Sequence, residues 1–228
     1  MTLTGILDRL ERLHGKLRPP GPADPYALVL HRNCGYPQSD ERCERGFQAL
    51  KQNIGLEVGK ILAVPDARLA EVLRESKSGM VPEKRARRLK EIAATVEGKF
   101  GGDLQGALAG SPAEARKVLK QFPTIGDSGA DRILLFGGIA PVAAIPATQT
   151  HVPLRIAFGG EKKNYAASYR AAQEYVESEV PAKFPTRQRA YLLLKKHGEE
   201  ICKAGRPLCE ECPVSTDCAY FGHSRTKR

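Results

Sequence analysis

The sequence of 228 residues contains no tryptophan and no apolar run long enough to cross a membrane. Its longest nearly apolar stretch, residues 133–147, is too short to span a bilayer and is interrupted by glycines and prolines. The N-terminus lacks a basic-then-apolar signal segment, because Asp8 and Arg9 follow its start almost at once. These absences argue against a membrane or secreted protein. We expect a folded globular protein of the cytoplasm, nucleoid-associated if bacterial.

Acidic residues are in deficit. The 26 Asp and Glu residues stand against 36 Lys and Arg residues, which gives a formal net charge of +10. Nucleic acid is the commonest partner of such a surface, because each cation that neutralises a phosphate releases condensed counterions. An acidic membrane surface is the alternative partner, but the sequence has no Lys/Arg-rich amphipathic tail and no lipidation motif. We therefore expect nucleic acid as the partner and no membrane association.

No stretch alternates with the period of a strand, whereas apolar residues recur at helical spacing. This pattern predicts an all-α fold of roughly ten short helices. The predicted helices cover residues 3–17, 24–30, 66–73, 83–100 and 112–119, then a segment after Gly126 and segments around residues 165–172 and 190–194. Residues 31–40 are polar and turn-rich and are predicted to form a loop. The basic run on helix 83–100 is predicted to be a solvated face, with phosphate contact as the alternative; it comprises Lys84, Arg85, Arg87 and Arg88.

The most distinctive feature is a cluster of four cysteines within seventeen residues of the tail: Cys202, Cys209, Cys212 and Cys218. Thiolates are soft anionic ligands, so four on one short loop can surround an iron-sulfur cluster or a tetrahedral zinc ion. Two disulfides are an alternative, but structural disulfides are rare in the cytoplasm. A common zinc knuckle uses two Cys-x-x-Cys pairs, and only one such pair is present. The spacing favours an iron-sulfur cluster and leaves zinc open.

The other two cysteines, Cys34 and Cys43, lie far from this cluster in the sequence. We interpret them as free, small, buried residues, with a second metal site as the alternative.

A second feature is the turn at residues 122–128, which carries the sequence Phe-Pro-Thr-Ile-Gly before a helical stripe. Gly126 can take a backbone conformation that residues with side chains disfavour. The following helix would expose amide groups at its N-terminus, where a phosphate oxygen can bind without a basic side chain. Such a site binds the nucleic-acid backbone and reads no sequence. An ordinary tight turn between packed helices is the alternative interpretation.

The spacing Cys-x6-Cys-x2-Cys-x5-Cys and the preceding Phe-Pro-Thr-Ile-Gly turn together resemble the endonuclease III branch of the helix-hairpin-helix (HhH-GPD) DNA glycosylases. The resemblance implies a two-lobed all-α fold, with a six-helix domain at residues 29–137 and an iron-sulfur domain formed by residues 1–28 with 138–228. It implies a monomer with a [4Fe-4S] cluster on the four cysteines. It also implies that double-stranded DNA lies between the lobes, with a damaged or mismatched base flipped out of the helix.

The resemblance assigns three sets of DNA-binding residues. The hairpin set comprises Thr124, Ile125, Gly126 and Ser128. The wedge set, which fills the gap left by the flipped base, comprises Tyr36 and Gln38 in the loop after the first core helix. The cysteine-loop set comprises Lys203 and Arg206, between the first two cysteines.

The chain departs from this family at both residues that carry the chemistry. The lysine with which bifunctional members attack the sugar corresponds to Ser128, so a Schiff-base lyase reaction through that lysine is excluded. The family's aspartate corresponds to Pro146 or to Gln149, depending on the alignment. No Asp or Glu occurs between Asp131 and Glu161.

Three hypotheses follow from these departures. The chain is a monofunctional glycosylase that uses another group, with Asp127, Asp131, Gln149 and His151 as the candidates. Or it excises only bases with weak glycosidic bonds. Or it is a catalytically silent protein that binds damaged DNA. A zinc-stabilised module that binds RNA or protein is the alternative from a different class.

Overall fold

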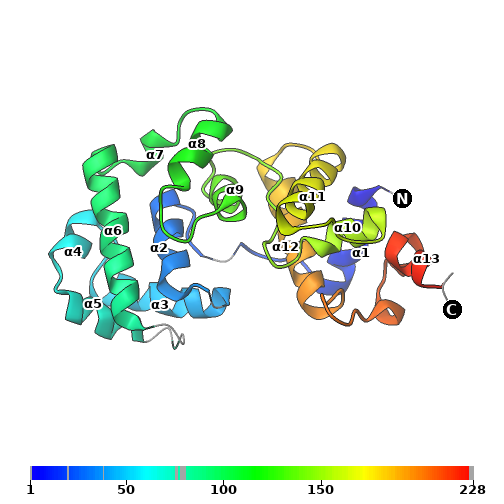
Figure 1. Ribbon diagram of the computed structural model, residues 1–228, viewed down its shortest axis with the longest axis horizontal. Coiled ribbons are helices and arrows are strands. Elements are labelled where there is room, and N and C mark those ends of the chain that lie inside the picture. Colours follow the sequence, from blue (N-terminus) through cyan, green and yellow to red (C-terminus); the bar gives the residue numbers. More distant parts are fainter. Residues whose placement is uncertain (1, 20, 38, 75–76, 78–80, 226–228) are drawn as a thin grey trace. The chain divides into compact units, whose positions relative to one another are not determined.

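The computed structural model describes residues 2–19, 21–37, 39–74, 77 and 81–225 (Figure 1). These residues are largely helical and include no strand, which confirms the all-α prediction. The chain divides into two compact units, Pro20–Ile139 and Met1–Pro19 with Ala140–Arg228. The first unit thus includes residues 20–28, which the resemblance placed in the other domain. Among the described helices, none is long and apolar enough to cross a membrane.

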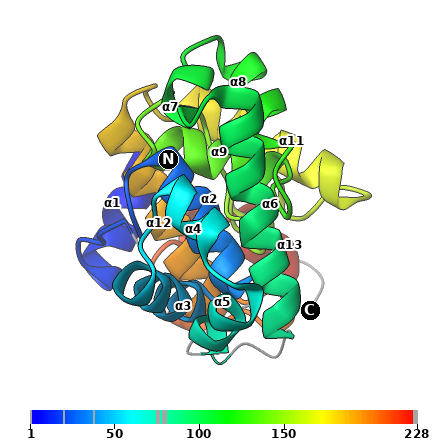
Figure 2. The same cartoon turned by 90° about the vertical axis from the view of Figure 1, so that its left-hand side faces the viewer.

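The unit Pro20–Ile139 is built around the long helix α6 (Figures 1 and 2). Its helices, in chain order, are α2 (Pro25–Gly35), α3 (Asp40–Asn53), α4 (Val58–Ala63), α5 (Asp66–Leu73), α6 (Pro82–Phe100), α7 (Leu104–Ala107), α8 (Pro112–Leu119) and α9 (Asp127–Phe136). Helices α2, α4 and α5 pack against α6, and α9 packs against α2 and α8. Leucines on facing helices, including Leu30, Leu69 and Leu89, are fully buried and form the core. The core therefore fixes α2, which contacts the predicted hairpin turn, and α9, which follows that turn.

The other unit gathers both ends of the chain. Its helices are α1 (Leu3–His14), α10 (His151–Phe158), α11 (Tyr165–Glu179), α12 (Phe184–Glu200) and α13 (Ala219–Arg225), with short 3-10 turns at η2 (Cys209–Glu211) and η3 (Ser215–Asp217). One hydrophobic core joins α1, α10, α11 and α12, and Cys202, Cys212 and Cys218 pack against its edge. The cysteine loop is therefore seated on a core to which both ends of the chain contribute.

The prediction of a loop at residues 31–40 was wrong for its first half, because α2 continues to Gly35. His31 and Asn33 are polar residues, yet both are buried inside this helix. His31 Nε2 lies 2.9 Å from Glu44 Oε2 on α3, and the Asn33 amide donates to the Val29 carbonyl at 2.9 Å. Local polarity suggested a loop, whereas hydrogen bonds to Glu44 and to the helix's own backbone accommodate these side chains inside a helix.

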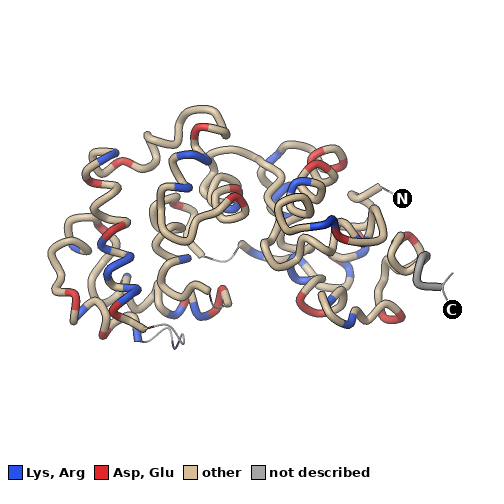
Figure 3. The backbone as a smooth tube through the Cα atoms, in the orientation of Figure 1, with Lys and Arg blue, Asp and Glu red and all other residues tan. Residues whose placement is uncertain are grey.

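Two further predictions were wrong in part. The first helix ends at His14 and not near Leu17, because Gly15 adopts a left-handed φ of 74° and closes the helix. On α6, basic and acidic residues recur along the helix (Figure 3), and Lys84 and Arg87 are exposed as expected, but Arg85 is fully buried. Its Nη1 donates to the Cys34 carbonyl at 2.8 Å, at the end of α2. Arg85 therefore stabilises the helix terminus and is not part of a solvated face.

Candidate functional site

The turn at residues 122–128 joins α8 to α9 and is strained at Thr124. The φ of Thr124 is 65°, in the left-handed region that β-branched residues rarely enter. Gly126, which the sequence suggested for such a conformation, has a φ of −97° that any residue adopts, so that expectation was wrong. Holding a residue with a side chain in the left-handed region lowers the stability of the fold by on the order of 1–2 kcal/mol, and surrounding contacts must offset this cost.

Two polar side chains near the end of α2 hold Thr124 in this conformation. Thr124 Oγ1 donates to Asn33 Oδ1 at 3.1 Å. The Asn33 amide also donates to the Pro123 carbonyl at 3.3 Å. Arg32 Nε donates to the Thr124 carbonyl at 3.1 Å. Asn33 is fully buried, where an unmade hydrogen bond is costly, so these bonds fix the strained turn to α2.

The first turn of α9 presents backbone amides at its surface. Gly126 is the N-cap residue, and within the described part of the chain the amides of residues 126–129 donate to no acceptor. A Cβ placed on Gly126 would meet no atom within 4 Å, so the space above it is open. Unbonded amides at a helix N-terminus attract an anion such as a phosphate oxygen.

The remaining predicted hairpin and wedge residues differ in what they can contact. The Ile125 side chain is buried, and its backbone amide donates to the Phe122 carbonyl at 3.3 Å. Neither the side chain nor the amide is therefore available to DNA. Ser128 is half-buried at the second position of α9. Tyr36 is half-buried just after α2, and its ring centroid lies 4.6 Å from the Arg32 guanidinium carbon. Gln38 lies outside the described residues.

Both acidic candidates near the hairpin are engaged in ion pairs. Asp127 is exposed at the start of α9, and its Oδ1 lies 2.6 Å from Lys120 Nζ. Asp131 is buried one turn later and pairs with Arg116. The carboxylate of Asp127, in the first turn of α9, also complements the helix dipole, and the ion pair with Arg116 accounts for Asp131, so neither residue requires a catalytic role.

The segment that corresponds to the family's aspartate is a turn before α10. Pro146 is buried, and its carbonyl accepts from the Gln149 amide at 3.0 Å. Gln149 is 7% exposed, and its Oε1 accepts from Thr148 Oγ1 at 2.8 Å. Its side chain packs so closely on α12 that a Cβ added at Gly198 would lie 2.4 Å from Gln149 Cγ. The Gln149 side chain is therefore held in one place by packing.

His151 serves the cysteine loop. It is 3% exposed, and its Nε2 donates to the Cys202 carbonyl at 2.7 Å. Burial lowers the pKa of His151, so the neutral ring is favoured. Its Nε2 hydrogen is therefore used to fix the first cysteine.

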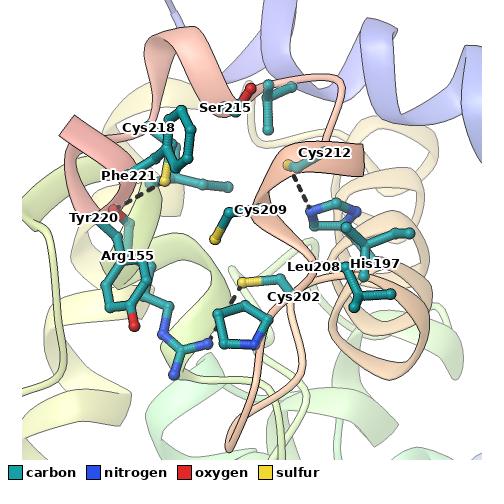
Figure 4. Close-up of a pocket in the computed structure, with 14 residues that line it drawn as sticks. Arg155, His197, Cys202, Leu208, Cys209, Cys212, Ser215, Cys218, Tyr220 and Phe221 are labelled. Atoms are coloured by element: carbon teal, nitrogen blue, oxygen red, sulfur yellow. Dashed lines mark hydrogen bonds between the residues drawn. The ribbon is translucent and has the colours of Figure 1, made fainter. Parts of the chain in front are cut away.

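The four clustered cysteines converge from one loop onto one pocket (Figure 4). Cys202 follows α12, Cys209 opens η2, Cys212 follows η2, and Cys218 precedes α13. All four are half-buried free thiols. The rest of the pocket is mostly apolar and is lined by Ile156, Ile201, Pro207, Leu208, Val214 and Phe221. We call this the cluster pocket.

Arg155 ties the first part of the loop to α10. Its Nη1 lies 3.7 Å from Cys202 Sγ and donates to the Lys203 carbonyl at 2.8 Å. Its Nη2 donates to the Ala204 carbonyl at 2.6 Å. The guanidinium carbon also lies 4.8 Å from the centroid of the Tyr220 ring. Arg155 therefore both shapes the loop and places positive charge beside a sulfur atom.

A pair of histidines lies behind the third cysteine. His197 Nε2 is 3.5 Å from Cys212 Sγ, and His197 Nδ1 is 3.3 Å from His14 Nε2. Burial, with a smaller contribution from His14, lowers the pKa of His197 to about 4. A neutral His197 can donate its Nε2 hydrogen to a Cys212 thiolate, as residues behind metal ligands commonly do.

These residues fit an iron-sulfur cluster. The loop offers four thiols, a mostly apolar wall, and N–H donors directed at two of the sulfurs, all of which such clusters use. Burial raises the pKa of Cys202 and Cys209 and raises that of Cys212 to about 11, so a metal group that binds them must displace protons. Among the described His, Cys, Asp and Glu residues, no three are grouped so as to hold a single metal ion. Lys203 and Arg206 are exposed on the same loop.

Sequence reasoning missed four functional side chains: Arg32, Asn33, Arg155 and His197. Each is a polar residue within an otherwise buried helical run, such as Leu28-Val-Leu-His-Arg-Asn in α2. Polar residues at core-facing helical positions require partners, so this pattern is the signal that could have identified them.

Comparisons with known proteins place this fold. No family model matches the sequence. The chain is 26% identical over 162 residues to a thymine/uracil-DNA glycosylase of Methanothermobacter thermautotrophicus, covering 71% of this chain and 66% of that protein. It is 24% identical over 161 residues to a thymine-DNA glycosylase of Aeropyrum pernix, covering 71% of this chain and 69% of that protein. The alignments thus span about two thirds of each curated relative.

Solved structures agree over nearly the whole chain. A trapped covalent intermediate of endonuclease III with DNA has a TM-score of 0.75 at 16% identity, covering 98% of this chain and 97% of that chain. A thermostable thymine-DNA glycosylase has a TM-score of 0.74 at 22% identity, covering 97% and 95%. These likenesses confirm the endonuclease III-like helix-hairpin-helix fold that the motifs indicated.

Proposed function

We propose that this chain is a DNA glycosylase of base-excision repair that acts as a monomer on double-stranded DNA. It flips a damaged or mismatched base out of the helix and hydrolyses the glycosidic bond without cutting the strand. Thymine and uracil are the first candidate bases, because both curated relatives bear the names of glycosylases for these bases. The observation that carries the proposal is the open cluster of unbonded amides at the start of α9, in a chain with this fold.

The hairpin binds the DNA backbone through these amides. A phosphate oxygen accepts from the amides of residues 126–129, and the exposed Lys120 lies close by, paired with Asp127. Such contacts position the protein on the duplex but carry no sequence information. Recognition of the base therefore depends on other residues, with Tyr36 as the candidate wedge.

Replacing Gly126 with alanine is expected to weaken DNA binding without destabilising the protein. Its φ of −97° suits alanine and the added Cβ meets no atom within 4 Å, so the melting temperature should not change. The methyl group would occupy the space that a phosphate approaches, so affinity for an undamaged duplex should fall at least about tenfold. Fluorescence anisotropy of a labelled duplex at one fixed salt concentration measures this affinity.

Gly160→Ala is the matched control, because a Cβ there also meets no atom within 4 Å and lies outside the hairpin. Its affinity should stay within about twofold of the unchanged protein. Equal affinities for the two variants would contradict backbone binding at the hairpin.

Of the candidate catalytic residues, Gln149 keeps a polar group without a partner. Asp127 is paired with Lys120, and the Nε2 hydrogen of His151 is used by the Cys202 carbonyl. The nitrogen of the Gln149 side-chain amide donates to no described residue, and the side chain is held by packing. An amide can orient a water molecule but cannot act as a base, so Gln149 is the candidate for positioning the attacking water.

The four cysteines hold a [4Fe-4S] cluster, with zinc as the alternative metal. The bound cluster supplies a rigid cross-link to a loop that has little regular structure. Arg155 and His197 stabilise the thiolates by donating to sulfur. The loop in turn presents Lys203 and Arg206 to phosphate.

A catalytically silent protein that binds damaged DNA is the second candidate function. It is favoured by the lack of any Asp or Glu between Asp131 and Glu161, and by the ion pairing of Asp131 with Arg116. Such a protein would keep the hairpin and the cysteine loop and would release no base.

A single-turnover incubation separates these functions. Excess protein is mixed with duplexes that carry uracil, a thymine mismatch, an oxidised pyrimidine, hypoxanthine or an alkylated purine, and free base and strand breakage are scored separately. We expect release of uracil or mismatched thymine without breakage. If the protein binds the duplexes tightly and releases no base from any of them, it is a catalytically silent DNA-binding protein.

A further inference from the structure

The last turn of α2 contacts both elements that we assign to DNA in the unit Pro20–Ile139. Arg32 reaches the hairpin through its Nε, which donates to the Thr124 carbonyl at 3.1 Å. The same guanidinium covers the Tyr36 ring, with 4.6 Å between its central carbon and the ring centroid. It also lies against the first turn of α9, because a Cβ on Gly129 would be 3.7 Å from Arg32 Nε. One side chain thus links the backbone-binding turn to the candidate wedge.

Contacts from outside the turn must offset the strain of the hairpin at Thr124. Thr124 has a left-handed φ of 65°, which its branched side chain disfavours. Asn33 bonds to the Thr124 hydroxyl and to the Pro123 carbonyl, and Arg32 bonds to the next carbonyl along the chain. Each of these bonds runs from α2 to the turn. The turn's conformation is therefore set by α2.

We propose that Arg32 and Asn33 are positioning residues that hold the hairpin and Tyr36 as one unit, so that backbone binding and base opening are coupled. This inference rests on the proposed binding of DNA by this chain. A phosphate bound at the α9 amides fixes the hairpin, the hairpin fixes Arg32 through the Thr124 carbonyl, and Arg32 fixes the Tyr36 ring by stacking. Neither residue touches the reacting bond.

The geometry requires an arginine and not merely a positive charge. A planar guanidinium can stack on the Tyr36 ring while its Nε donates to a carbonyl. A lysine ammonium has the same charge but no donor at the Nε position and no planar face. Arg32→Lys therefore separates positioning from simple attraction of phosphate.

The test uses the full-length metal-loaded protein and two readouts. The first is affinity for an undamaged duplex. The second is the fluorescence of 2-aminopurine placed beside a G·T mismatch, measured at saturating protein, because this base brightens when it is unstacked.

For both Arg32→Lys and Arg32→Met we expect affinity to fall about tenfold and the increase in 2-aminopurine fluorescence to fall at least by half. Tyr36→Ala should lose the fluorescence rise while its affinity stays within about twofold. Gly126→Ala should lose affinity and should also show a smaller rise at saturating protein, because no phosphate then fixes the hairpin.

The outcomes are distinguishable. Arg32→Lys keeps the size and charge of the side chain, so it tests the inference even if Arg32→Met fails to fold. If Arg32→Lys keeps both readouts within about twofold while the unchanged protein binds and opens the mismatch, Arg32 has no positioning role and the inference is overturned. If the unchanged protein neither binds DNA nor brightens 2-aminopurine, the proposed function itself fails, and the inference fails with it.

Discussion

Cys209→Ser is expected to lose the bound metal cluster and most of the DNA affinity together. Cys209 begins η2, and few backbone hydrogen bonds hold the loop around it, among them the bond from the Leu208 amide to the Ile201 carbonyl at 2.9 Å. Without four thiolates the cross-link is lost, and Lys203 and Arg206 no longer have fixed positions. Loss of two phosphate contacts should weaken binding on the order of tenfold or more at moderate salt.

The measurements are the visible absorption spectrum, the iron content and duplex affinity at fixed salt. A [4Fe-4S] protein is yellow-brown, whereas a zinc protein is colourless. Cys34→Ala is the matched control, because Cys34 is a buried free thiol in the other unit and the change should leave colour and affinity intact. If Cys209→Ser lost its metal and still bound DNA with full affinity, the assignment of the loop to DNA would be wrong. If the protein without substitutions is colourless and contains zinc, the bound metal is zinc and not an iron-sulfur cluster.

The sequence predicted those elements whose ends are determined by nearby residues. The helix predicted at residues 66–73 is α5, Asp66–Leu73. The helix predicted at residues 112–119 is α8, which opens with Pro112 and has a capping box formed by Ser111 and Glu114. Asp24 caps α2 by accepting from the Ala27 amide at 2.7 Å. In each case the signal and the structure it produces lie within four residues, so no knowledge of the tertiary fold is needed.

The errors occur where a distant partner decides the conformation. Residues 31–35 are polar enough to suggest a loop, but Glu44 on α3 accommodates His31 inside a helix. Arg85 has the spacing of an exposed face, yet it is buried against the end of α2. The left-handed residue of the hairpin is Thr124 and not the glycine two positions later, because Asn33 and Arg32 hold it there. Tertiary contacts override local propensity at each of these places.

The site could be predicted in part. Cysteine spacing predicted a ligand set, because cysteines are seldom grouped for another reason, and the structure brings all four to one pocket; that they bind a metal stays a prediction. The residues around the cysteines could not be predicted. Arg155 and His151 contact the loop from α10, far away in the sequence, and His197 contacts Cys212 from the helix that precedes the loop. His151 illustrates the limit: the sequence left it open between a catalytic candidate and a hydrogen-bonded core histidine, and its contacts tie it to the cysteine loop.

Introducing a lysine at the position of Ser128 is expected to add strand-cleaving activity that the unchanged protein lacks. Ser128 is half-buried at the second position of α9, next to the amides that bind phosphate in our proposal, and it corresponds to the family's lysine. The helix N-terminus disfavours an ammonium charge, so a lysine there is more readily the free amine that attacks the sugar. The unchanged protein should release base and leave the strand intact, and it should form no adduct on treatment with borohydride. Ser128→Lys should form a trapped protein–DNA adduct and break the strand.

Ser128→Arg is the control that isolates the nucleophile, because it adds the same charge and similar bulk but no amine able to form a Schiff base. If Ser128→Lys and Ser128→Arg are equally inactive in trapping while both still release base, residue 128 does not approach the sugar and the correspondence with the family's lysine is wrong. If the unchanged protein already gives the trapped adduct, another amine in the chain is the nucleophile and hydrolysis by water alone is ruled out. Trapping confined to Ser128→Lys would mean that this chain keeps the geometry for a lysine nucleophile and lacks only the amine.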